Sequence, residues 1–156
     1  MTTQESNLVE APPAKRIAIY RRVACHSLHS AASLDAQRTL CDEAARVRGW
    51  EVVTHYTDAG WSGHAIERPA LGCLLAQASL GRFDIVLLSQ LDRMSRNLVV
   101  LLDVVERLRG AKVTLFTRTE LGTVVDVGVY FDRLMAGGLE ETHAAESEWA
   151  LEQEGL

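Results

Sequence analysis

Arginine side chains follow two of the segments that the sequence pattern marks as β-strands. Arg21 and Arg22 end the run RIAIYRRV, and Arg93 and Arg96 come directly after the run FDIVLLSQ, within LDRMSRN. Ligands of open α/β sheets collect at the carboxyl ends of the strands, where these side chains are expected to converge. Because Arg93 and Arg96 are three residues apart, they would share one face of a helix and hold a phosphate between them. Any one of these arginines taken alone is best interpreted as a solvated residue at the start of a helix. Their clustering at the strand ends favours a phosphate site instead.

The segments that must position this site begin with a strand over 16–23, which a small, polar stretch ends. A helix is predicted over 33–48, with Ser33 as its N-cap and Gly49 just past its end. A second strand follows over 51–58, and a glycine-containing loop comes next.

The second half of the chain alternates in the same way, and Arg68, in the loop before its first helix, is a further candidate for the phosphate site. The predicted elements are a helix over 69–81, a buried strand over 83–90, a helix over 96–109, a strand over 112–118 and a last helix over 127–152. The helix over 96–109 is expected to bury one apolar face, formed by Leu98, Leu101, Leu102, Val105 and Leu108. This order predicts an α/β fold: a mostly parallel sheet of four to five strands with helices on both faces, followed by a long C-terminal helix.

The charge of the chain is uneven. The formal net charge is -5, but six glutamates and no lysine or arginine lie beyond residue 133, which leaves 16 basic and 15 acidic residues before that point. The acidity therefore belongs to the tail, at positions 140, 141, 146, 148, 152 and 154. Only Lys15 and Lys112 are lysines, and this preference for arginine suits bidentate phosphate contact or equally a GC-rich genome.

Composition also narrows the class of protein. The chain has 156 residues, 47% of them hydrophobic, as expected for one compact globular domain. Its most apolar stretch carries Asp103 and Glu106, and its first residues lack a basic start and an apolar run, so we expect a cytoplasmic protein without a membrane segment. The three cysteines are scattered and never form a CxxC pair, which argues against disulfides and against a zinc site.

Four short motifs resemble the signatures of the serine recombinase (resolvase/invertase) family. They are YRRVA, SLDAQ, SGHAIERPAL and LDRMSRN, in this order between residues 16 and 118, with a gap between the first two that is similar to that of the large serine integrases. The resemblance implies a resolvase-like catalytic domain over 16–126, followed by a long helix with an acidic tail over 127–156. Residues 1–15, which contain Pro12 and Pro13 and lack apolar periodicity, are expected to form a disordered leader. No separate DNA-binding domain is expected.

The resemblance implies site-specific DNA recombination without a metal or other cofactor. A serine attacks a DNA phosphodiester, forms a 5′-phosphoserine link and releases a 3′-hydroxyl, and the ends are then exchanged and rejoined. Arginines stabilise the charge on the phosphoryl oxygens. Carried over by position, these arginines are Arg22, Arg68, Arg93 and Arg96, and the supporting polar residues are Tyr20, Gln37 and Asp92.

The position of the nucleophilic serine is occupied by Ala24, which has no oxygen to attack with. The chain is therefore expected to be catalytically impaired, and the alanine is either natural, giving a pseudoenzyme, or engineered to trap a DNA complex. Cys25 is a poor substitute, because on a continuing strand its side chain points away from the face of Arg22. Ser27, Ser30 and Ser33 lie in a predicted loop, and a displaced nucleophile there is disfavoured.

The last helix departs from the family in a second way. In the family this helix supplies the dimer interface and then crosses DNA, but here its second half carries carboxylates that would repel a phosphate backbone. A stripe along it is either a dimer interface or packing against its own sheet: Phe131, Leu134, Met135, Gly138, Thr142, Ala145 and Trp149.

Three interpretations follow. The first is a serine recombinase catalytic domain that forms a homodimer on DNA but is catalytically impaired because Ala24 replaces the nucleophile. The second is a non-catalytic regulator, or a decayed fragment, that forms a heterodimer with an active recombinase. The third, an unrelated domain for a small phosphate ligand, is disfavoured because no GxGxxG or P-loop sequence is present.

Overall fold

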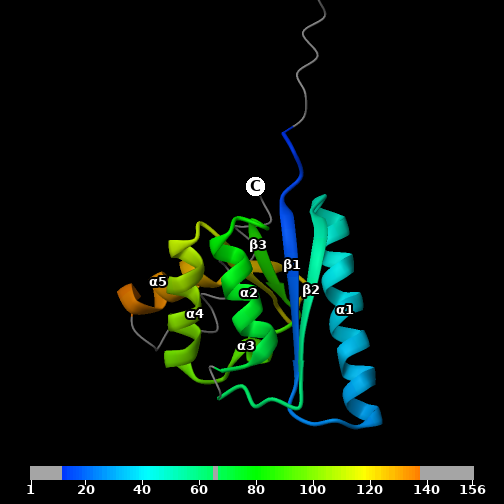
Figure 1. The fold of residues 1–156 in the computed structure, drawn as a ribbon. Helices are drawn as coiled ribbons and strands as arrows, with labels where there is room; N and C mark the ends of the chain where they lie inside the picture. The colour runs from blue at the N-terminus through cyan, green and yellow to red at the C-terminus, as the bar shows by residue number, and fades with distance from the viewer. Residues whose placement is uncertain (1–11, 65–66, 138–156) are drawn as a thin grey trace, which may run out of the picture.

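The computed structural model describes residues 12–64 and 67–137, which form one five-stranded sheet in the order β2-β1-β3-β4-β5 (Figure 1). The first four strands in the chain are parallel, and the fifth runs antiparallel to its neighbour. The strands are β1 (Arg16–Val23), β2 (Glu51–Ala59), β3 (Ile85–Leu88), β4 (Thr114–Arg118) and β5 (Val124–Asp126). The helices of the described residues are α1 (Leu28–Arg48), α2 (Pro69–Ser79), α3 (Leu91–Met94), α4 (Leu98–Gly110) and α5 (Val127–Gly137). The predicted α/β fold with a mostly parallel sheet is confirmed.

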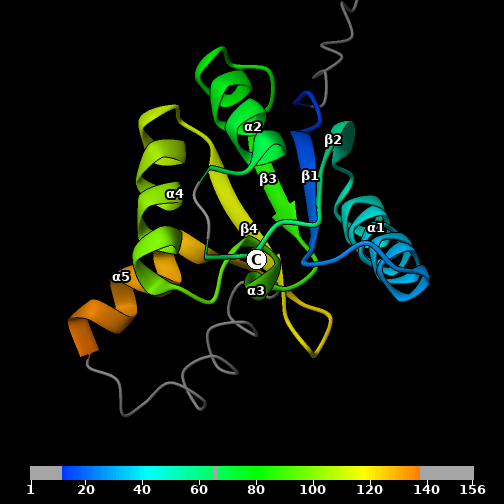
Figure 2. The ribbon, with the colours of Figure 1, turned by 60° about the horizontal axis from the view of Figure 1, so that its bottom comes forward.

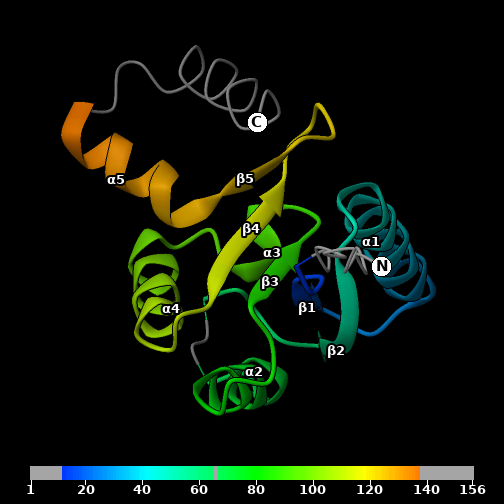
Figure 3. The same ribbon diagram turned by 90° about the horizontal axis from the view of Figure 1, so that it is seen from above.

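Helices cover both faces of the sheet, as Figure 3 shows in a view along the strands. Alternate residues of β1 point to opposite faces, so Ile17 and Ile19 pack under α1 while Ala18 and Tyr20 pack under α2 and α4. All four side chains are fully buried. Each face therefore has its own apolar core, and β1 lies between the two.

The first helix starts earlier than the sequence indicates. α1 begins at Leu28, with Ser27 as the N-cap whose Oγ accepts a hydrogen bond from the Ser30 amide. Ser33 lies inside the helix, so the prediction of Ser33 as N-cap is wrong. The predicted end is confirmed, because Gly49 adopts a left-handed conformation with φ of 68°.

The structure around α4 differs from the sequence prediction in two details. The predicted helix from residue 96 instead begins at Leu98 with Asn97 as its N-cap, and a separate turn of helix, α3, precedes it. The apolar face is also rotated, since Leu98 is 47% exposed and Leu102 is only partly buried. The buried residues of α4 are Val100, Leu101, Val104, Val105 and Leu108.

The last helix begins at Val127, as predicted, and is fixed to α4. Arg109 donates to Asp132 over 2.8 Å, and its guanidinium crosses α5 where Gly128 leaves room: a Cβ there would lie 2.7 Å from Nη2. Residues 1–11 of the leader predicted over 1–15, and the predicted continuation of the helix over 138–152, lie outside the described residues. No helix within 12–64 and 67–137 is long and apolar enough to cross a membrane.

The carboxyl ends of β1, β2 and β3 meet at one edge, seen in Figure 2 with α3 beside them. Arg22 ends β1 in register with Asp58 of β2. The chain after β3 turns at once into α3, which contacts β1. The sheet thus brings together the segments in which the arginines were predicted.

Candidate functional site

Arg22 binds the main chain of two other segments at this edge. Its Nε donates to the Arg93 carbonyl at 2.8 Å, its Nη2 to the Asp92 carbonyl at 2.9 Å and its Nη1 to the Trp61 carbonyl at 3.0 Å. The side chain is only 9% exposed. Arg22 therefore joins the end of β1 to α3 and to the loop after β2.

Gln37 fixes the backbone of the same residue. Its Oε1 accepts from the Arg22 amide and its Nε2 donates to the Arg22 carbonyl, each at 3.2 Å, while Nε2 also donates to Ser33 Oγ. Gln37 is 3% exposed. Gln37 therefore joins α1 to the end of β1.

Arg68 lies inside the protein rather than in an open loop. It is 1% exposed, its guanidinium carbon lies 5.7 Å from the centre of the Tyr20 ring, and its Nη1 donates to Tyr20 Oη at 3.0 Å. Tyr20 Oη in turn donates to Asp58 Oδ2 at 2.8 Å. Burial raises the pKa of Tyr20, and although Arg68 acts in the opposite direction, the hydroxyl stays protonated and able to donate.

Asp58 is a residue of this network that the predicted site set lacks. Besides Tyr20, it accepts hydrogen bonds from the amides of Ala70 at 2.9 Å and Leu71 at 3.0 Å, in the first turn of α2. A carboxylate stabilises the free amides and the positive end of a helix. The signal in the sequence is an acidic residue ending a strand before a helix that starts at a proline without a capping side chain.

Arg93 and Arg96 do not share one helix face. α3 ends at Met94, and Ser95 is extended, with φ of -169°, so the predicted helical spacing of the two arginines is wrong. Arg96 is exposed and pairs with Asp92 over 3.4 Å. Arg93 is half-buried, and within the described residues its Nε and Asp92 Oδ1 are buried without a hydrogen-bond partner.

The loop after β2 is held between Arg22 and α3. Ser95 Oγ donates to the Gly63 carbonyl at 2.7 Å and accepts from the Asn97 amide at 2.9 Å. A Cβ on Gly63 would lie 3.0 Å from Arg22 Nη2 and 3.5 Å from Ser95 Cα. This close packing was not predicted, because nothing in the sequence shows which residues the loop contacts.

Ala24 lies exposed just beyond the end of β1. Because the strand stops at Val23, the strand alternation used to direct Cys25 away from Arg22 does not apply. Cys25 is exposed, and its Sγ lies 3.4 Å from Ser30 Oγ. The hydroxyls of Ser27 and Ser30 bond to each other at 3.0 Å.

The site concentrates positive charge. Burial lowers the pKa of Arg22 from its usual value, and the charges of Arg68 and Arg93 lower it further. A guanidinium remains protonated under these conditions, so the mutual repulsion persists in the folded protein. No cluster of metal-ligating side chains occurs among residues 12–64 and 67–137.

Comparison with known proteins shows the family to which the chain belongs. Residues 17–154 match the family model described as "Resolvase, N terminal domain". The chain belongs to this family and is a serine recombinase catalytic domain.

Individual relatives agree with this assignment. A putative DNA recombinase of Bacillus subtilis (strain 168) is 34% identical over 131 residues, which are 83% of this chain but 25% of that protein. The chain thus spans about a quarter of the length of that curated relative. The N-terminal catalytic domain of TP901-1 integrase is 31% identical, with a TM-score of 0.64 over 78% of this chain and 92% of that one.

A resolvase family site-specific recombinase from Streptococcus pneumoniae shares the fold. Its TM-score is 0.61 at 21% identity, covering 90% of this chain and 89% of that one. The predicted family and the similarity to integrases are confirmed.

Proposed function

We propose that this domain engages the DNA backbone through its arginine site but does not form the covalent phosphoserine link. The observation that carries the proposal is Ala24, which stands beside Arg22 at the carboxyl end of β1, where the family resemblance places the nucleophile. Arg68 and Arg93, from two other segments of the chain, lie close enough to Arg22 for their charges to act on it. A phosphodiester fits such a site because its non-bridging oxygens carry the charge that guanidinium groups bind.

The serine hydroxyl that Ala24 lacks takes part in both the cleavage step and the rejoining step of strand exchange. In the reaction implied by the resemblance, the serine Oγ bonds to phosphorus as the 3′-oxygen leaves, and a 3′-hydroxyl later displaces the serine. The methyl group of Ala24 has no lone pair for the first step. Loss of a nucleophilic serine costs on the order of 10⁶ in rate in a hydrolase. Water is no substitute here, because hydrolysis would leave no phosphoserine bond for rejoining.

The serine hydroxyls that follow Ala24 in the chain already form hydrogen bonds with other groups. Ser27 Oγ caps α1 through the Ser30 amide, and Ser33 Oγ accepts from Gln37. Moving either hydroxyl to a phosphate would break the contact that orders the start of α1 or supports Gln37. These contacts disfavour a displaced serine nucleophile.

The direct test restores the oxygen. The chain and its Ala24→Ser variant are incubated with supercoiled plasmid carrying DNA from either side of the chain's coding sequence, and covalent adducts are sought after denaturation. We expect an adduct only from the variant. The control is Ala32→Ser, which adds the same hydroxyl to the exposed surface of α1. An adduct from the unchanged protein, or none from a folded Ala24→Ser protein, would overturn the proposal that Ala24 alone prevents the link.

A second role, pairing with an active recombinase in the cytoplasm, is favoured by the exposed side of α5. Phe131 packs into the domain's own core and is 5% exposed, whereas Val129 is 37% and Met135 69% exposed. The remaining predicted stripe residues after Gly137 lie outside the described residues. Mass measurement in solution, with and without a related recombinase, tests this role. A monomer under both conditions would eliminate it.

A further inference from the structure

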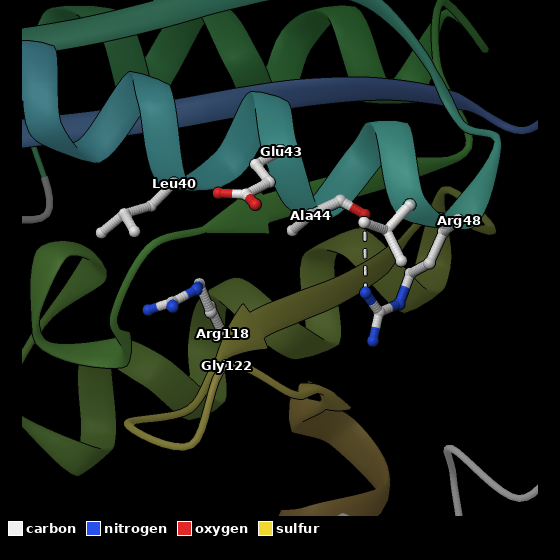
Figure 4. A pocket seen from close by; sticks show the side chains of 7 residues that line it. Leu40, Glu43, Ala44, Arg48, Arg118 and Gly122 are labelled. Carbon is white, nitrogen blue, oxygen red and sulfur yellow. Dashed lines mark hydrogen bonds between the residues drawn. The ribbon is translucent and has the colours of Figure 1, made fainter.

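A groove of about 580 Å³ lies between α1 and the turn that joins β4 to β5 (Figure 4). One wall is a stripe of α1 at helical spacing, and the other comes from the end of β4 and the turn. The lining residues are Leu40, Glu43, Ala44, Val47, Arg48, Arg118 and Gly122. The groove lies on the α1 face of the sheet, opposite the face of Tyr20 and Arg22.

The groove combines apolar surface with positive charge. Val47 on α1 is 67% exposed, and Leu121 at the tip of the turn is 76% exposed. Arg48 lies against Trp50, with its guanidinium carbon 5.7 Å from the ring centre, and Arg118 reaches into the groove from the end of β4 (Figure 4). Glu43 is the one carboxylate among the lining residues. Such a surface suits a segment that alternates carboxylates with apolar side chains.

The wall formed by the turn is well ordered by its own bonds. The Thr119 amide donates to the Thr123 carbonyl at 2.8 Å, and the two threonine hydroxyls lie 2.6 Å apart. The Gly122 amide donates to the Thr119 carbonyl at 3.0 Å, and its φ of 84° requires glycine or a strained residue. Arg118 and Leu121 therefore belong to a hydrogen-bonded turn, and a wall formed before binding lowers the entropic cost of binding.

We propose that the occupant of this groove is the chain's own acidic segment, residues 138–156. That segment carries six glutamates and no lysine or arginine, and it places Trp149 and Leu151 between glutamates in the run ESEWALEQE. The rest of the chain has one more basic than acidic residue. The carboxylates pair with Arg48 and Arg118, and the apolar side chains cover Val47 and Leu121.

The acidic segment is covalently attached to α5 and is long enough to reach the groove. The twelve peptide units from Gly137 to Trp149 span up to about 40 Å when extended. A domain of about 120 residues has a radius of gyration of about 14 Å. The link also raises the effective concentration of the segment to the millimolar range, so weak contacts suffice. Docking would hold the segment after α5 against this domain, independently of Ala24 and of any reaction with DNA.

The test follows Trp149 in the full chain. The three tryptophans are replaced by 5-fluorotryptophan, and Trp149→Phe assigns the corresponding fluorine resonance among the three. Cleavage after the tail glutamates by a glutamyl endopeptidase is measured on the same protein. Arg118→Glu reverses one charge of the groove, and Arg82→Glu makes the same change on the exposed α2–β3 turn as a control. A third variant changes the six tail glutamates to glutamine and leaves the folded domain untouched.

Docking predicts that Arg118→Glu and the glutamine variant both move the Trp149 resonance toward its position in urea. Arg118→Glu also speeds tail cleavage about two- to fivefold, which corresponds to the loss of one or two surface ion pairs. Arg82→Glu leaves both readouts unchanged. A Trp149 resonance that is the same in every variant overturns the proposal. A resonance that shifts with protein concentration also overturns it, because the groove would then bind the segment of a second copy.

Discussion

The side-chain amide of Gln37 pairs with both main-chain groups of Arg22, accepting from its amide and donating to its carbonyl at 3.2 Å. These two hydrogen bonds resemble those between neighbouring strands of a sheet, and they join the end of β1 to α1. They hold the backbone two residues before Ala24. The glutamine thus fixes the end of β1 just before Ala24.

We expect Gln37→Ala to destabilise the domain by about 1–3 kcal/mol, because it leaves a buried amide and carbonyl of Arg22 without partners. Urea unfolding followed by circular dichroism gives the change in free energy. Gln90→Ala is the control, since this glutamine is exposed and makes no capping hydrogen bond to α3. The control should change stability by less than about 0.5 kcal/mol. Equal effects of the two changes would contradict the role assigned to Gln37.

The sequence predicted the sheet and the convergence of arginines because both depend on local patterns. Alternating apolar runs identify the strands, and parallel strands end at one edge. The bonding of each arginine depends instead on loops distant in the chain. Arg22 binds carbonyls 39 and 71 residues away, which no periodicity reveals. The extended Ser95 that separates Arg93 from Arg96 is likewise a tertiary effect, since its hydroxyl bonds to Gly63.

Gly63→Ala should weaken the site and the fold together. The added Cβ would lie 3.0 Å from Arg22 Nη2, and that guanidinium cannot move without losing bonds to three carbonyls. A change of about 1–3 kcal/mol is expected, as for overpacking of a core. Thermal unfolding measures it.

Gly72→Ala is the matched control for this change. Gly72 lies within α2, and a Cβ there has no neighbour within 4 Å. Alanine in a helix interior is favoured over glycine by about 0.5–1 kcal/mol, so this variant should be stabilised. If Gly63→Ala were also stabilising, the packing described around Arg22 would be wrong.

Inorganic phosphate should stabilise the protein through Arg93. At ten times its dissociation constant a ligand contributes about 1.4 kcal/mol, which raises Tm by about 3–6 °C for a chain of this size. Arg93→Gln should reduce that rise at constant ionic strength, whereas Arg82→Gln, on the exposed turn before β3, should not. A phosphate effect that survives Arg93→Gln in full would count against a site centred on these arginines.

The three thiols should react at very different rates. Cys25 and Cys73 are exposed, whereas Cys41 is fully buried under the sheet, and burial raises its pKa to about 12. At pH 8 roughly one Cys41 side chain in 10⁴ is a thiolate. Ellman's reagent should therefore label two thiols rapidly in the folded protein and the third only as it unfolds. Cys41→Ala should abolish the slow phase alone. Three equally rapid thiols would show that the packing of α1 on the sheet does not protect Cys41.

His55 should make the stability of the fold depend on pH in the weakly acidic range. It lies on the face of β2 covered by α1, and its Nδ1 is buried without a hydrogen-bond partner among the described residues. Burial, followed by the charges of Arg21 and Arg38, lowers its pKa from 6.5, while Asp42 acts in the opposite direction. The unfolded chain therefore binds a proton at a higher pH than the folded protein does. The stabilisation is present in full above pH 6.5 and is lost as the pH falls from there through the lower pKa of the folded state.

His55→Gln should remove the contribution of this histidine to the dependence of the unfolding free energy on pH, because glutamine does not titrate. The free energy of unfolding by urea is measured between pH 5 and pH 8 for both proteins, and the difference between them should grow as the pH rises toward 6.5 and then level off. His29→Gln removes an imidazole from the exposed side of α1 and serves as the control. A slope reduced equally by the two variants would place the titrating group elsewhere. A slope that steepens in His55→Gln would mean that the folded state favours the charged imidazole, and that Asp42 outweighs Arg21 and Arg38.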